Sequence, residues 1–222
     1  MKKLFLILLG ILAVQNVSIA QDTYSEQMQT NVSKLDIAKS VGDYQALAND
    51  FLRLAEYKKT DWLSYYYAAY CNTKIGWLDM QSPDKITPFA NVADEQIKNA
   101  LTLLDTNKMK NDLSEVYCVR SMIYRAKVYI NPMTNGKKYG PAANQYSKRA
   151  NQLNPENPRA IYLLGWEKYN TPKLWGGDKD KAKEYFQSAG NFFSKENKSS
   201  NLKPHWGERD NQDILAKYDK QK

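Results

Sequence analysis

The feature that most constrains the fold is a helical spacing of apolar residues between a few breaks rich in glycine and proline. The breaks stand at Gly42, Ser82-Pro83, 132–141, 155–158, 172–177 and 204–207. Between them apolar residues recur every three or four positions, which is the spacing of one helix face. The sustained alternation of a half-buried strand is missing from the sequence. The sequence therefore predicts an all-helical protein.

The predicted helices come in pairs. Ala143, Ala150 and Pro155 are spaced by seven and then five residues, and Pro158 follows at once. Small residues allow two helices to pack closely, while proline ends one helix and is tolerated in the first turn of the next. The pairs are expected at about 24–57, 60–105, 112–155 and 158–196, with a last helix at about 207–220.

These spacings resemble the tetratricopeptide repeat family. The matching residues are Ala182, Phe186 and Ala189, the outer positions Ala143, Ala150 and Pro155, and Ile161, Leu164 and Gly165 of a first helix. The resemblance covers roughly residues 24–196 and implies a short right-handed α-solenoid whose first helices line a concave surface. The chain departs from the family pattern by loops expected at 76–88, 131–140 and 171–177.

The first twenty residues are typical of a secretory signal peptide. A charged start precedes an apolar run at 4–14, and Ala20 ends a site of small residues. The run is shorter than the about 20 residues of a transmembrane helix; an uncleaved anchor is the alternative. We expect cleavage near Ala20 and a periplasmic or secreted mature chain without a transmembrane span. The predicted domains are a signal peptide (1–20), a helical repeat domain (21–200) and a C-terminal capping helix with its tail (201–222).

The charge favours acidic partners. The net charge is +8 and becomes +6 when the two lysines of the signal peptide are removed (8 − 2). A positive balance favours a partner with negative charge, such as an anionic envelope surface, although dispersed lysines are also typical of solvated helix faces. No nucleic-acid motif is present and export separates the chain from nucleic acid, so we expect no such partner.

Few residues could carry catalysis. His205 is the single histidine, which excludes metal sites built from several histidines and leaves it as a general base or as a loop contact that docks the last helix. Cys71 and Cys118 lie in apolar helical stretches, where they form either one disulfide or two buried thiols. We therefore predict no catalytic residue, no metal site and no cofactor, and a protein that is not an enzyme.

Aromatic stripes are the candidate binding residues. They comprise Tyr66, Tyr67, Tyr70, Tyr162, Trp166 and Tyr169. Consecutive tyrosines on one helix cannot all point into the core. The family resemblance implies that the outward members form a groove on the concave face, whereas the alternative is that they fill space between repeats. We expect a scaffold that binds a protein or peptide segment there; the alternative is a carbohydrate or cell-envelope binding protein.

Overall fold

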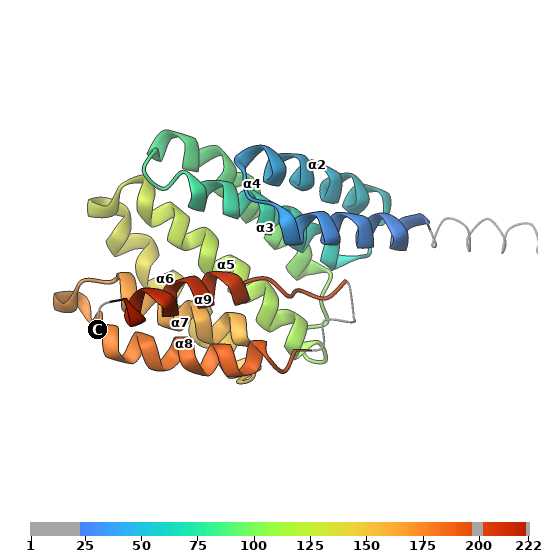
Figure 1. Ribbon diagram of the computed structural model, residues 1–222. Helices are drawn as coiled ribbons and strands as arrows, with labels where there is room; N and C mark the ends of the chain where they lie inside the picture. Colours follow the sequence, from blue (N-terminus) through green and yellow to red (C-terminus); the bar gives the residue numbers. More distant parts are fainter. Residues whose placement is uncertain (1–22, 197–201, 221–222) are drawn as a thin grey trace, which may run out of the picture.

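The computed structural model describes residues 23–196 and 202–220, and within them all regular structure is helical (Figure 1). A helix of residues 23–37 is followed by α2 (Val41–Tyr57), α3 (Trp62–Leu78), α4 (Pro83–Thr102), α5 (Lys110–Ile130), α6 (Pro132–Leu153), α7 (Pro158–Asn170), the 3-10 turn η1 (Lys173–Trp175), α8 (Lys179–Phe193) and α9 (Glu208–Asp219). The predicted all-α fold is confirmed. The predicted signal peptide at 1–20 lies outside the described residues.

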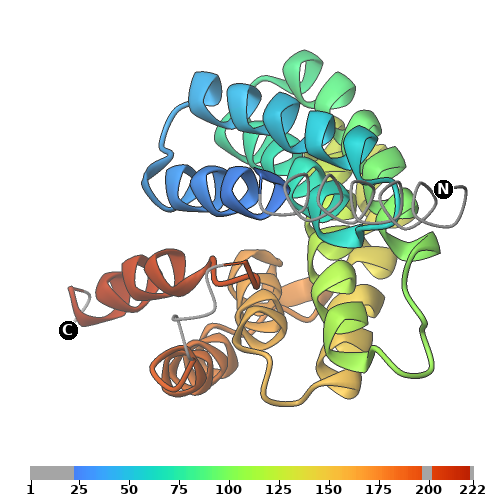
Figure 2. The ribbon, with the colours of Figure 1, turned by 90° about the vertical axis from the view of Figure 1, so that its right-hand side faces the viewer.

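The helices form an array in which each one packs on the next along the chain. In addition α3 packs on α5, and α5 packs on α7, so these three helices form a continuous layer. Both views of the ribbon place the helix of residues 23–37 beside α2 (Figures 1 and 2). The expected pairing of helices is therefore found in α3 with α4, α5 with α6, and α7 with α8.

Local sequence signals set the helix starts. Ser40 and Asp43 form a capping box at α2, and the side chains of Asn157 and Asp178 accept hydrogen bonds from the first turns of α7 and α8. Proline occupies an initial position of α4, α6 and α7, where its missing N–H has no intrahelical partner.

Two of the expected loops are largely helical. The loop expected at 131–140 is wrong, because α6 begins at Pro132 and continues through Pro141. The loop expected at 76–88 is reduced to a short turn, since α3 reaches Leu78 and α4 begins at Pro83. In α6 the proline removes one backbone hydrogen bond. Packing of Tyr139 on Tyr124 and burial of Ala143 hold the helix on both sides of it.

Small residues bring α5 and α6 close together. Ala143 and Ala150 are fully buried. The hydroxyl of Ser121 donates to the carbonyl oxygen of Ala143 at 2.8 Å, and that of Ser114 donates to the carbonyl oxygen of Ala150 at 2.8 Å. Side chains of one helix can reach the backbone of the other only because no larger side chain separates them.

Both cysteines are free thiols inside the core. Cys71 lies on α3 and Cys118 on α5, and neither is exposed. Burial raises the pKa of both thiols well above the usual value. Of the two alternatives left open by the sequence, the structure has the buried thiols and not the disulfide.

Candidate functional site

The predicted aromatic groove is filled by the chain itself. Tyr66, Tyr67, Tyr70, Tyr162 and Trp166 are buried, and Tyr169 is half-buried. The expectation that several of these rings are exposed is therefore wrong for the first five. The alternative, that bulky aromatic residues fill space between helices, describes their position. Their role in binding a partner stays a prediction.

The cover comes from the segment 202–207, which runs along α3. The Trp206 ring stacks on Tyr70 with centroids 4.9 Å apart, and its indole N–H donates to the Tyr66 hydroxyl at 2.7 Å. The Tyr67 hydroxyl donates to the carbonyl oxygen of Leu202 at 2.9 Å. The neighbouring His205 contacts Asp36 of the first helix at 2.7 Å. These tyrosines therefore hold the C-terminal segment in place.

A buried ion network lies next to this contact. Arg159 on α7 donates to Glu115 on α5 at 2.8 Å and to Glu196 after α8 at 2.5 and 3.0 Å. Burial opposes the charge on Arg159, but the two carboxylates raise its pKa well above the usual value. One guanidinium and two carboxylates thus connect α5, α7 and the residues after α8. In the part of the chain that the structure describes, no group of three His, Cys, Asp or Glu residues could hold a metal ion.

A row of four half-buried tyrosines on α5 and α6 is the candidate functional site. The tyrosine row consists of Tyr117 and Tyr124 on α5 and of Tyr139 and Tyr146 on α6. The ring centroids are 5.5 Å apart for Tyr117 and Tyr146, 5.3 Å for Tyr146 and Tyr124, and 5.9 Å for Tyr124 and Tyr139. Residues seven apart share one helix face, so the two pairs meet along the line where the helices touch.

Cations flank the tyrosine row. The Arg120 guanidinium lies 4.7 Å from the Tyr146 ring, and the Lys127 and Lys138 amines lie 5.8 and 4.9 Å from the Tyr139 ring. Burial raises the pKa of Tyr146, and the charge of Arg120 acts in the opposite direction. These rings and charges suit a flat ligand that carries anionic groups.

Two further observations favour a ligand beside the tyrosine row. The buried Nε of Arg120 has no hydrogen-bond acceptor among the described residues. The whole of α6 contains no Asp or Glu, while it contains four basic residues, namely Lys137, Lys138, Lys148 and Arg149. An anionic ligand would therefore meet no repelling carboxylate on this helix, and the nearby carboxylate of Asp94 on α4 is paired with Lys127 at 2.9 Å.

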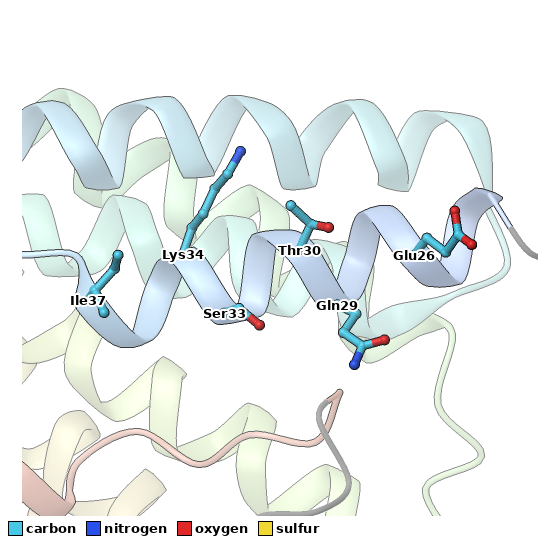
Figure 3. A pocket seen from close by; sticks show the side chains of 6 residues that line it. All are labelled: Glu26, Gln29, Thr30, Ser33, Lys34 and Ile37. Carbon is cyan, nitrogen blue, oxygen red and sulfur yellow. The ribbon is translucent and has the colours of Figure 1, made fainter.

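Two surface hollows lie elsewhere, at the first helix. One has a volume of about 600 Å³ and is lined by side chains of the first helix, namely Glu26, Gln29, Thr30, Ser33, Lys34 and Ile37. Figure 3 shows that Lys34 and Gln29 point to opposite sides of this helix. The other, of about 620 Å³, lies between this helix and α2 and includes Arg53 and Tyr57. Neither hollow contains a residue of the tyrosine row or of the predicted aromatic groove.

The tyrosine row is not among the binding residues predicted from the sequence. Tyr117 and Tyr124 stand seven residues apart on α5, and the same spacing separates Tyr139 and Tyr146 on α6. Because a loop was expected at 131–140, Tyr139 was not assigned to a helix, and its pairing with Tyr146 on one helix face was not recognised. The signal that could have found the row is the matched spacing in two neighbouring helices.

The fold defines an all-helical protein built from an array of packed helix pairs. Among solved structures the chain is similar to the HusA haemophore from Porphyromonas gingivalis, with 31% sequence identity and a TM-score of 0.76. The similarity covers 86% of this chain and 90% of that chain. The chain therefore belongs to the same family as this haemophore. No family model and no curated protein sequence matches the chain. None of the described helices has the length and apolar character that crossing a membrane requires.

Proposed function

We propose that this chain is an exported haem-binding protein and that the tyrosine row is its haem site. The observation that carries the proposal is the similarity to HusA, a protein named as a haemophore. This similarity extends over most of both chains. Export is supported by the predicted signal peptide at 1–20.

The chemistry of haem agrees with the tyrosine row. Haem is a flat aromatic ring system with two carboxylates and an iron ion. Aromatic side chains pack on such a ring, and basic side chains pair with its carboxylates. Tyrosine oxygen is a known ligand of haem iron. The tyrosine row offers phenol groups, and Arg120 and Lys138, which lie over two of its rings, supply positive charge that would attract a carboxylate.

The chain's histidine is a less suitable iron ligand. Both ring nitrogens of His205 already have partners, namely the carboxylate of Asp36 at 2.7 Å and the carbonyl oxygen of Lys203 at 2.8 Å. Binding iron through this ring would require the loop to detach from the first helix.

We keep the tetratricopeptide-like description as part of this proposal, with a helical repeat domain at 21–200 and a capping helix at 201–222. A protein or peptide segment that bound to Tyr66, Tyr67 and Tyr70 would have to displace the segment 202–207. A glycan would face the same requirement. The proposal is therefore ligand binding at the tyrosine row, without turnover of a substrate.

The test is a titration with haemin followed by the Soret absorption band. We expect the protein to bind haemin, and the double variant Tyr124→Phe/Tyr146→Phe to bind it about tenfold more weakly, with an altered spectrum, because two phenol oxygens are lost. The matched control is Tyr57→Phe, which removes an exposed phenol from α2.

Two outcomes would contradict this proposal. If the unmodified protein does not change the Soret band of haemin, the chain is not a haem-binding protein. If the protein binds haemin and the double variant binds it equally well, the site lies elsewhere. A loss of affinity in the Tyr57→Phe control alone would place the site in the hollow between the first helix and α2.

A further inference from the structure

Most of the exposed large apolar side chains lie at the connections between the two helices of a pair. Of eight such residues in the described part of the chain, six lie where an odd-numbered helix is followed by an even-numbered one: Ile37, Val41, Leu78, Met133, Leu174 and Trp175. We call this the turn end. In Figure 1 the connections from α3 to α4, from α5 to α6 and from α7 to α8 lie on the left-hand side of the array, while the connection from the first helix to α2 lies nearer the middle.

The most exposed of these residues stand at the tip of η1. Leu174 is 89% exposed and Trp175 is 74% exposed, although they are neighbours in the chain. Two adjacent apolar side chains this accessible to water are unfavourable in isolation, because each could be stabilised by about 2 kcal/mol on full burial. Exposure of this kind marks an interaction site.

The backbone around η1 is fixed by hydrogen bonds. The amides of Trp175 and Gly177 donate to the carbonyl oxygen of Pro172 at 2.9 and 3.1 Å. The amine of Lys168 donates to the carbonyl oxygen of Gly176 at 2.8 Å, and the amide of Asp178 donates back to the carbonyl oxygen of Lys168 at 3.0 Å. The tip therefore has a defined shape on the end of α7.

Two glycines make this shape available. Gly176 has a φ of 89°, a backbone angle that residues with a side chain rarely adopt. A Cβ atom on Gly177 would overlap the carbonyl oxygen of Thr171. The turn thus depends on both glycines, and in it the apolar pair is exposed.

Lysines outnumber aspartates in the segment that contains the apolar tip. Residues 168–181 include four lysines and two aspartates, and Lys173 directly precedes Leu174. The exposed Met133, at the neighbouring turn, is followed by Lys137 and Lys138. Apolar tips with lysines beside them complement a surface that has anionic groups outside and an apolar layer beneath.

We propose that the turn end docks onto an anionic phospholipid bilayer, with Leu174 and Trp175 in the interfacial layer and the lysines against the headgroups. Tryptophan is enriched at the membrane interface, and basic side chains are attracted to anionic lipids. The apolar residues stand on separate protruding turns, which fits a broad lipid surface. This inference does not depend on haem binding.

The experiment is sedimentation of the chain from Gln21 onward, which contains every described residue, with lipid vesicles. Vesicles of phosphatidylethanolamine and phosphatidylglycerol are compared with vesicles of phosphatidylcholine alone. We expect binding to the anionic vesicles, weaker binding in added salt, and little binding to phosphatidylcholine. The double variant Leu174→Ser/Trp175→Ser should bind about tenfold less. The control Tyr57→Ser, which removes an exposed aromatic ring outside the turn end, should bind as the parent protein does.

The outcomes separate the alternatives. Failure of the parent protein to bind anionic vesicles, or equal binding by the double variant, overturns the proposal. Dimers that form without lipid and disappear in the double variant would show that the turn end contacts a second copy of the chain, which also overturns it. Circular dichroism of each variant confirms that it is folded, and unchanged haemin binding would keep this result separate from the haem site.

Discussion

At the scale of single residues, Gly165 sets the distance between α7 and α8. A Cβ atom at this position would lie 2.9 Å from the ring of Phe186 and 3.0 Å from the Cβ atom of Tyr185. The Phe186 ring is fully buried and packs against Tyr162 and Tyr169, so it has no free space to move into. A missing side chain thus allows an aromatic ring to lie directly on the helix backbone.

The variant Gly165→Ala should be destabilised by about 1 kcal/mol in urea unfolding. Alanine favours the helix by about 1 kcal/mol over glycine, but overpacking in a filled core costs about 1–3 kcal/mol. The matched control is Gly136→Ala in α6, where a Cβ atom meets no atom within 4 Å. This control should gain about 0.5–1 kcal/mol. Equal stabilisation of both variants would show that Phe186 is free to move.

At the scale of helices, the start of α7 joins two helices through one amide side chain. The side-chain oxygen Oδ1 of Asn157 accepts a hydrogen bond from the backbone N–H of Arg159 at 2.9 Å. Its NH₂ group donates to Glu115 at 2.8 Å and to the Ser114 hydroxyl at 2.9 Å on α5. The same residue therefore caps α7 and satisfies a buried carboxylate.

The variant Asn157→Asp should be destabilised by about 2–4 kcal/mol, although aspartate and asparagine are equally good helix caps. The substitution removes the NH₂ donor and places a second carboxylate beside Glu115, whose charge is buried. Urea unfolding at neutral pH measures the effect. The control Asp178→Asn changes an exposed cap on α8 and should shift stability by less than about 0.5 kcal/mol. Similar effects at both caps would exclude the link to α5 as the cause.

At the scale of the whole molecule, the C-terminal segment closes the array. The indole of Trp206 packs on α3, and the Lys74 amine on α3 pairs with Asp210 on α9 at 3.2 Å. His205 reaches the first helix through Asp36. Segments from both ends of the described chain therefore meet, and the C-terminal one covers the buried Tyr66, Tyr67 and Tyr70 of α3.

The variant Trp206→Ala should be destabilised by about 2–4 kcal/mol, because it removes a stacked ring and leaves the Tyr66 hydroxyl without its donor. The opened face should also bind the dye ANS. Trp175→Ala is the matched control, since it removes an exposed indole, and its stability should change by less than about 0.5 kcal/mol. If the two variants unfold at the same urea concentration, the segment 202–207 does not contribute to the stability of the array.

The parts of the structure that sequence could predict are those with a local signal. The spacing of Ala143, Ala150 and Ala189 identified helix faces, and these residues are buried as helix contacts. The cover on Tyr66 and Tyr67 had no such signal, because it comes from residues about 140 positions away that lie in a loop. Periodicity shows which residues share a helix face, but not which distant segment packs on it.

The unpaired state of Cys71 and Cys118 has a practical consequence for handling the protein. No disulfide bond contributes to the described fold, so the protein should have the same structure in reducing and in oxidising buffers. A reagent that modifies thiols needs access to the thiolate, and both sulfur atoms are enclosed in the core and protonated at neutral pH. Each molecule therefore contains its own chemical reporter, and the rate at which the thiols are labelled records how often the core opens.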